Sequence, residues 1–328
     1  MYALFALSLA LAVGKNIFSK IGKKRFGDFS GMLTLNIVAG AFAVALFLCM
    51  GLDFRKMDGA AFWTIALAYG IFTMSAQMFH IIAIKYGELS VCSMIYSSGF
   101  LVSTVFSVFY FHETVGVLKG IGLFLTCLSI FLISVRFQKR GAATDKKRGY
   151  KYLLFAVPAM LSSGLVGVLQ KLFADLCGSV GLNEYLFLGF AEILLFSGVI
   201  KLGLLLFKRK KRMKTDARVL TQNALELETE FGTELKTEGE KTPEKRAKRA
   251  WIVSGVLALG FAACWVLTGR FNLYLTGVID GVIFFPVYNG GTIALTAAVS
   301  FLCLKEKPTV WKLVGIAIGI CSFVLIGL

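Results

Sequence analysis

The sequence predicts an all-helical membrane protein that crosses the bilayer ten times, with the helices arranged as two inverted repeats of five. Three observations lead to this fold class. Apolar residues make up 57% of the 328 residues and charged residues only 16%, against about 25% in an ordinary soluble domain. The apolar residues gather in segments of membrane-spanning length, and the two halves of the chain share similar segments in the same order. This composition argues against a disordered chain and a disulfide-stabilised scaffold.

Ten segments have roughly the length of about 20 mostly apolar residues that a transmembrane helix needs. The first is the least regular, because it carries Lys15 and Asn16 into the membrane. We interpret it as a retained helix and not a signal peptide, since it has neither a basic start nor a small-residue cleavage pattern. The predicted spans are 2–21, 31–50, 60–83, 87–111, 115–135, 151–171, 183–207, 251–270, 274–303 and 309–328.

The net charge of +16 resembles a nucleic-acid signal until the charges are located. Of the 35 Lys and Arg residues, 29 lie in or beside the connections that follow odd-numbered spans. Basic residues accumulate on the cytoplasmic side of a membrane protein. We therefore expect no nucleic-acid partner, a location in the cell membrane, and both termini outside.

The connection 208–250 is the longest, and this orientation places it in the cytoplasm. It begins with five consecutive basic residues, ends with a second basic cluster and has an acidic centre. It shows no sustained apolar stripe, so we expect disorder or a frayed helix. The basic clusters are either topology anchors or a binding site for anionic lipid head groups.

An internal repeat divides the chain. Residues 96–99 (Tyr-Ser-Ser-Gly) match 288–291 (Tyr-Asn-Gly-Gly), and Lys119 matches Lys312. Each match is weak, and their shared order is the evidence. The units are 1–137 and 150–328, the second interrupted by the long loop. Because five is odd, the second unit enters the membrane from the opposite side, as in many secondary transporters.

The sequence resembles the EamA-like members of the drug/metabolite transporter superfamily. The segments that carry the resemblance are 83–87 (Ala-Ile-Lys-Tyr-Gly) and 110–114 (Tyr-Phe-His-Glu-Thr) in the first half. In the second half they are 286–291 (Pro-Val-Tyr-Asn-Gly-Gly) and 305–308 (Lys-Glu-Lys-Pro). The resemblance implies ten helices in two inverted repeats, a central cavity, and secondary transport of small organic solutes, often outward.

Two features depart from the pattern of that family. The family often has a proline in the fourth span, where this chain has Ser97, Ser98 and Gly99, and only Pro286 keeps it in the ninth. Family members are also usually described with cytoplasmic termini, whereas the charge count favours termini on the outside. We keep the expectation of outside termini, because the charge count is a property of this sequence itself.

Polar and aromatic side chains inside the spans are the candidates for a solute pathway, since a charge near the bilayer centre costs roughly 2.5–3.5 kcal/mol on insertion scales. We expect the first, third, fourth, sixth, eighth and ninth spans to form its walls. Each candidate also has a structural reading, as a packing or interface residue. The candidate substrate-binding residues are Gln77, His80, Tyr96, Trp265, Tyr288 and Asn289.

Two ionisable residues are candidates for proton or ion coupling. Glu192 lies about ten residues into the seventh span, and His80 is one of two histidines in the chain. Histidine titrates within the physiological pH range. The alternative for Glu192 is a structural pair with a lysine, and for His80 a packing contact with a hydrogen bond to a neighbouring carbonyl group.

The sequence holds no catalytic motif and no cluster of metal ligands, so we expect no enzyme activity, cofactor or metal. We predict a permease that moves an amino acid or related metabolite by alternating access, outward and coupled to protons. The alternatives are a flippase-like lipid-handling protein and a non-transporting scaffold or sensor. The expected partners are a small solute and membrane lipids, with the chain a monomer or homodimer.

Overall fold

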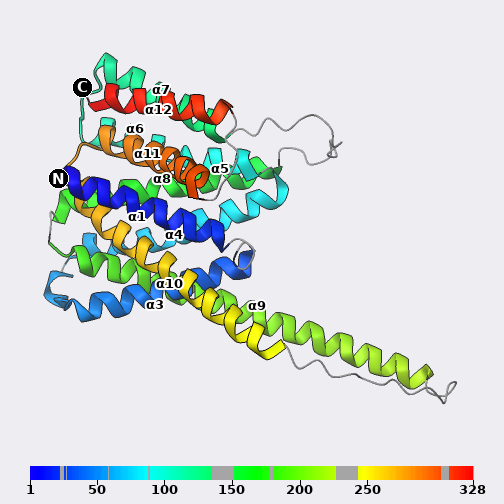
Figure 1. The fold of residues 1–328 in the computed structure, drawn as a ribbon. Coiled ribbons are helices and arrows are strands. Elements are labelled where there is room, and N and C mark those ends of the chain that lie inside the picture. Colours follow the sequence, from blue (N-terminus) through cyan, green and yellow to red (C-terminus); the bar gives the residue numbers. More distant parts are fainter. Residues whose placement is uncertain are drawn as a thin grey trace.

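The structure, a computed structural model, describes residues 1–22, 26, 28–57, 59–87, 89–134, 151–177, 180–226, 243–303 and 310–327. These residues form helices joined by short turns, with no strand among them, which confirms the all-helical prediction (Figure 1). The helices are α1 (Tyr2–Ile21), α3 (Phe29–Cys49), η1 (Phe54–Lys56), α4 (Ala60–Tyr86), α5 (Leu89–Ser97), α6 (Phe100–Tyr110), α7 (Val117–Ser134), α8 (Lys151–Cys177), α9 (Leu182–Glu226), α10 (Pro243–Thr276), α11 (Gly281–Cys303) and α12 (Val310–Gly327).

The described helices account for each of the predicted spans. Eight helical segments are long and apolar enough to cross a membrane, one of them being the α5–α6 pair. The other two predicted spans correspond to shorter apolar stretches, Val117–Ile133 in α7 and Leu313–Ile326 in α12. The chain is therefore a multi-pass membrane protein.

The fourth predicted span, 87–111, is broken into α5 and α6 by a turn at Ser98 and Gly99. A Cβ atom on Gly99 would lie 2.7 Å from the backbone oxygen of Met160 in α8. The break therefore occurs where α8 approaches so closely that a side chain would not fit.

The ninth predicted span, 274–303, begins too early. Helix α10 continues to Thr276, and α11 starts only at Gly281, after a turn. The turn contains apolar residues, among them Val278, so the sequence pattern includes the turn in the predicted span. The periodicity of apolar residues does not reveal such a break.

Much of the predicted loop 208–250 is helical. Helix α9 stays helical to Glu226 and α10 begins at Pro243, so both project beyond the bundle (Figure 1). Of the two expectations for this loop, the helical one fits its two flanks. The segment between them, 227–242, lies outside the described residues, and so does most of the acidic centre.

Both chain ends lie at the same end of the bundle, and the α9–α10 projection lies at the opposite end (Figure 1). This arrangement requires an even number of crossings. It also separates the termini from the basic loop 208–250, as the charge pattern predicts. Which end faces the cytoplasm stays a prediction.

The helices pack in pairs that are symmetric between the two halves. Helix α1 packs against α10 and α4 against α8, while α3 packs against α9 and α7 against α12. If the two halves are exchanged, the α1–α10 pair becomes the α8–α4 pair. The α3–α9 and α7–α12 pairs each become themselves. Two inverted repeats would produce this pairing. The unit boundaries 1–137 and 150–328 stay a prediction.

Small residues allow the closest of these contacts. A Cβ on Gly122 of α7 would lie 2.6 Å from the Ile326 side chain of α12, and one on Gly315 would lie 2.8 Å from Ile133. The Ser129 hydroxyl donates a hydrogen bond of 2.7 Å to the Gly315 carbonyl oxygen. Lipid provides no hydrophobic force between helices, so close packing and such hydrogen bonds hold the α7–α12 pair together.

Candidate functional site

A cavity of about 350 Å³ lies in the centre of the bundle. The described residues that line it come from α1, α4, α5, α6, α8, α10 and α11. These are the helices of the six spans from which we expected the walls. Both halves contribute, so the cavity lies between them. Its volume is in the range of small-molecule sites.

Helical periodicity explains which side chains face the cavity. Besides Gly269, the lining residues on α10 are Phe261, Trp265, Thr268 and Asn272, which follow one another at intervals of three or four residues. Such residues lie on one face of a helix. The same face therefore carries two aromatic rings, a hydroxyl and an amide along the wall.

The structure brings five of the predicted substrate-binding residues together in this cavity. Gln77 of α4, Tyr96 of α5, Trp265 of α10, and Tyr288 and Asn289 of α11 all line it. Four helices, two from each half, thus present aromatic or amide side chains to the same space. Whether these residues bind a solute stays a prediction.

His80 is not among the described lining residues. Its ring stacks on Tyr96, with the ring centroids 4.5 Å apart. Its Nε2 atom lies 3.4 Å from the Ser93 hydroxyl oxygen. His80 therefore packs against Tyr96, which lines the cavity.

Glu192 also lies outside the described lining. Its side chain is buried between α9 and α4, where it occupies the space beside Gly70, and neither carboxylate oxygen has a hydrogen-bond partner among the described residues. Tyr69, next to Gly70 in the chain, lines the cavity and packs against Tyr185 with the ring centroids 5.1 Å apart. Glu192 therefore lies beside the neighbour of a lining residue and does not itself line the cavity among the described residues.

Lys15 is a lining residue that the sequence candidates omitted. It lies in the second half of α1, is partly buried, and is the one charged side chain among the described lining residues. The sequence does contain a signal for Lys15, because an ionisable residue inside a span is by default a candidate for function. The irregularity of the first span at this position hides that signal.

Neighbouring polar residues are fixed by hydrogen bonds between the halves. The Ser8 hydroxyl donates to Asn272 Oδ1 at 2.5 Å, and Asn16 Nδ2 donates to Thr296 Oγ1 at 3.2 Å. These bonds tie α1 to α10 and α11. They hold two amide groups of the cavity wall in fixed orientations.

Arg270 of α10 is held by a contact with a neighbouring helix. Its Nε donates a hydrogen bond of 2.9 Å to Asn183 Oδ1, and the residue is not among the described lining of the cavity. The contact joins α10 to α9. It accounts for Arg270 as a structural residue.

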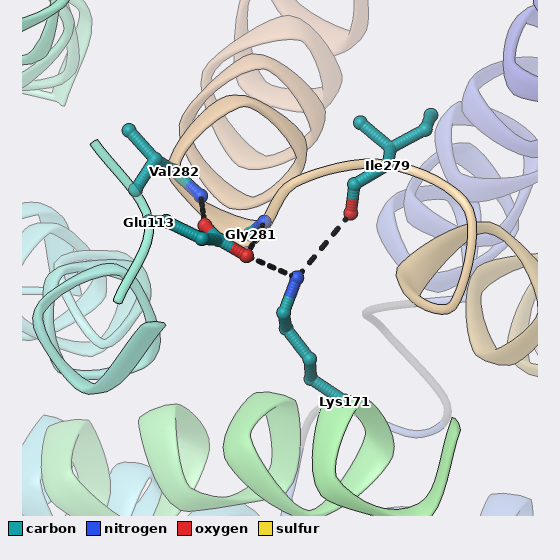
Figure 2. A network of polar contacts seen from close by, with 5 residues as sticks. All are labelled: Glu113, Lys171, Ile279, Gly281 and Val282. Atoms are coloured by element: carbon teal, nitrogen blue, oxygen red, sulfur yellow. Dashed lines mark hydrogen bonds and ion pairs between the residues drawn. The ribbon is translucent and has the colours of Figure 1, made fainter. Parts of the chain in front are cut away.

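An ionic network joins the two halves of the chain where the connection after α6 meets the start of α11 (Figure 2). Lys171 Nζ of α8 lies 2.5 Å from Glu113 Oε1, with both side chains 10% exposed, and 3.4 Å from the Ile279 carbonyl oxygen. The Gly281 and Val282 amides donate to the Glu113 carboxylate at 3.0 and 2.8 Å. Glu113 of the first half therefore caps the N-terminus of α11 in the second.

The carboxylate suits this position because a helix N-terminus presents free amides and a partial positive charge. Burial alone would raise the pKa of Glu113. The hydrogen bonds from Lys171, Val282 and Gly281, together with the Lys171 charge, outweigh it and lower the pKa below its ordinary value. His112, the preceding residue, has a φ of 53°, an uncommon left-handed conformation that turns the chain at this point.

Nothing in the sequence indicates that Glu113 and Lys171 pair, because they lie 58 positions apart and Glu113 is in the connection between α6 and α7. Glu306, the repeat partner of Glu113, lies outside the described residues.

The part of the chain that the structure describes has no group of three or more His, Cys, Asp or Glu residues placed to hold a metal ion. The cavity wall consists of aromatic, amide and hydroxyl groups with one lysine. Such a surface can bind an organic molecule by stacking, hydrogen bonding and charge.

Comparison with known proteins agrees with this architecture. Residues 1–135 match the model of the EamA-like transporter family. Twenty-eight chains of solved structures match the fold. One of them, described as "Crystal structure of protein", has a TM-score of 0.67 at 13% sequence identity, and the match covers 98% of this chain and 94% of that one. No curated protein matches the sequence.

The first 135 residues therefore resemble the EamA-like transporter family, and the whole chain has a fold similar to that of a solved structure. The solved structure supports the fold over the whole chain, and at 13% identity it supports nothing beyond the fold.

Proposed function

We propose that the chain is a secondary transporter that moves a small organic solute across the cell membrane by alternating access. Export is the direction that the family resemblance implies. The observation that carries the proposal is the central cavity, because both halves line it and each supplies aromatic and amide side chains. Inverted-repeat transporters bind their substrates at such a position, between the repeats.

The ionic network is the contact that keeps one end of this pathway closed. Glu113 belongs to the first half, whereas Lys171, Gly281 and Val282 belong to the second. If the halves rock apart at this end, the carboxylate must leave the α11 amides. We infer that these bonds break and re-form once in each transport cycle.

Glu192 is our candidate for proton coupling, with His80 as the second. A buried carboxylate without a hydrogen-bond partner is costly when charged, and so it favours uptake of a proton. Tyr185 interacts electrostatically with both Glu192 and Tyr69, and Tyr69 lines the cavity. A movement of these tyrosines during the cycle would connect the carboxylate with the cavity.

The test is solute flux through reconstituted vesicles, screened with amino acids, nucleosides and sugar derivatives, with and without a pH gradient. We expect flux of at least one class. Trp265→Ala should reduce it at least about tenfold, because stacking and packing against a large aromatic residue are lost. Phe124→Ala is the matched control, since Phe124 is 69% exposed on α7 and outside the described cavity lining.

Flux of no class by folded protein would contradict the transporter proposal. A flippase-like or scaffold function would then become the better reading. If a flux is found, Glu192→Gln should abolish its dependence on the pH gradient while leaving exchange at equal pH. Retained gradient dependence in both Glu192→Gln and His80→Ala would remove the coupling assignment.

A further inference from the structure

Among the described residues that line the cavity, one is charged and none carries the opposite charge. Lys15 is the single charged side chain among the described lining residues, and neither of the described salt bridges, Lys171–Glu113 and Lys56–Asp53, involves it. It lies in α1, within a candidate membrane span. A lysine inside a membrane protein is expected to face a partner charge, a backbone carbonyl or a water-filled space.

The surroundings of Lys15 offer hydrogen bonds but no negative charge. Neighbouring α10 supplies two aromatic rings to the wall, Phe261 and Trp265, whose centroids lie 5.6 Å apart with the ring planes tilted by 60°. The amides of Gln77 and Gln170 face the same space. No aspartate or glutamate appears among the described lining residues, so a positively charged group on a ligand would find no carboxylate there.

The nearby Lys, Arg and Glu residues have partners or lie outside the described lining. Lys171 is bound to Glu113 and Arg270 to Asn183, and Glu192 packs beside Gly70 between α9 and α4. The other ionisable groups of the described lining are the phenols of Tyr69, Tyr96 and Tyr288. The described lining therefore combines one ammonium group with aromatic faces and neutral donors. Such a site favours a ligand with one negative charge and a flat apolar body.

We infer that the transported solute is an organic monocarboxylate with an aromatic or flat apolar body, whose carboxylate pairs with Lys15 while its body stacks on Trp265. This inference rests on the proposed transport function and specifies its substrate class. A phosphate ester fits less well, because it carries up to two charges and prefers several donors or a guanidinium group. An amino-acid zwitterion fits less well, because its ammonium group would lack a partner.

Binding of three compounds that share an indole ring tests the inference. They are indole-3-acetate, tryptophan and tryptamine, which present an anion, a zwitterion and a cation. Binding is measured by calorimetry on the full-length protein in lipid nanodiscs, so no transport is required. We expect indole-3-acetate to bind at least about tenfold more tightly than the other two, since hydrogen bonds to charged groups contribute roughly this much.

Substitutions at position 15 then assign the effect to the lysine. Lys15→Gln should weaken indole-3-acetate binding about 10- to 100-fold and leave the weak tryptamine binding unchanged or improved. Lys15→Arg keeps the charge and should retain most of the affinity, which also controls for folding. Lys20→Gln is the matched control, because Lys20 is on the same helix but exposed and outside the described lining.

The inference is overturned if none of the three compounds binds, if tryptophan or tryptamine binds more tightly than indole-3-acetate, or if Lys15→Gln binds it like the wild type. Its failure is distinguishable from failure of the transport function. Flux of a zwitterion unaffected by Lys15→Gln would overturn the substrate class and leave transport standing. If the carboxylate binds in a way that depends on Lys15 but no compound is transported, the transport function is overturned and the ligand class stands.

Discussion

Two lysines within the bundle are treated in opposite ways. Lys171 lies at the closed end, where it pairs with Glu113 and contacts the Ile279 carbonyl oxygen. Lys15 lies in the cavity, where none of the described lining residues is a carboxylate. The comparison indicates that a buried lysine stabilises the fold where the protein supplies a carboxylate to pair with it. Where the protein supplies none, the lysine is available to bind a ligand.

The largest expected effect is at the closed end. Lys171→Ala or Glu113→Ala leaves a buried charge without its partner, which typically costs about 3–5 kcal/mol of stability. The measurement is thermal or denaturant unfolding in detergent. The double variant Glu113→Gln with Lys171→Met should recover much of that loss. Single variants as stable as the wild type would show that the pair is not structural.

Replacement of the cavity lysine, Lys15, should affect stability differently from replacement of Lys171. Lys15→Met removes an unbalanced charge, so we expect unchanged or higher stability in the same unfolding assay, together with weaker solute binding. Functional sites commonly trade stability in this way. A loss of stability as large as that of Lys171→Ala would erase the distinction between the two lysines.

The closed end should respond to acid in a definite direction. Because the pKa of Glu113 is lowered in the folded protein, its contribution to stability is fully present above the unfolded pKa of about 4.3. That contribution is lost as the pH falls through the folded-state value. Unfolding measured between neutral and strongly acidic pH should therefore show a component that Glu113→Gln removes, and an unchanged profile would contradict the network.

The smallest expected effect concerns a hydrogen bond between the halves. Ser8→Ala removes the 2.5 Å bond to Asn272. Interhelical hydrogen bonds in membrane proteins contribute about 0.6 kcal/mol on average, so stability should change little. Because Asn272 lines the cavity, solute affinity is the more sensitive measurement, and a change in stability above about 2 kcal/mol would point to a larger packing role.

The sequence predicted the membrane-spanning helices and the six spans that line the cavity, because both depend on local patterns. Apolar runs define the spans, and helical periodicity brings Trp265 and Asn272 to one face of α10. The break at Gly99 escaped prediction because it lies where Met160 of α8, distant in the chain, approaches. The pairing of Glu113 with Lys171 and the α11 amides escaped as well, since it joins a turn and two helices that are distant in the sequence.

The most direct test of the account is counterflow in vesicles that contain the purified protein. Vesicles loaded with unlabelled solute, from the class that the flux screen identifies, are diluted into a trace of the same solute with a label. An alternating-access carrier predicts transient accumulation of label above equilibrium, lost in Trp265→Ala and kept in Phe124→Ala. Equilibration without an overshoot, or an overshoot that Trp265→Ala leaves unchanged, would contradict transport through the central cavity.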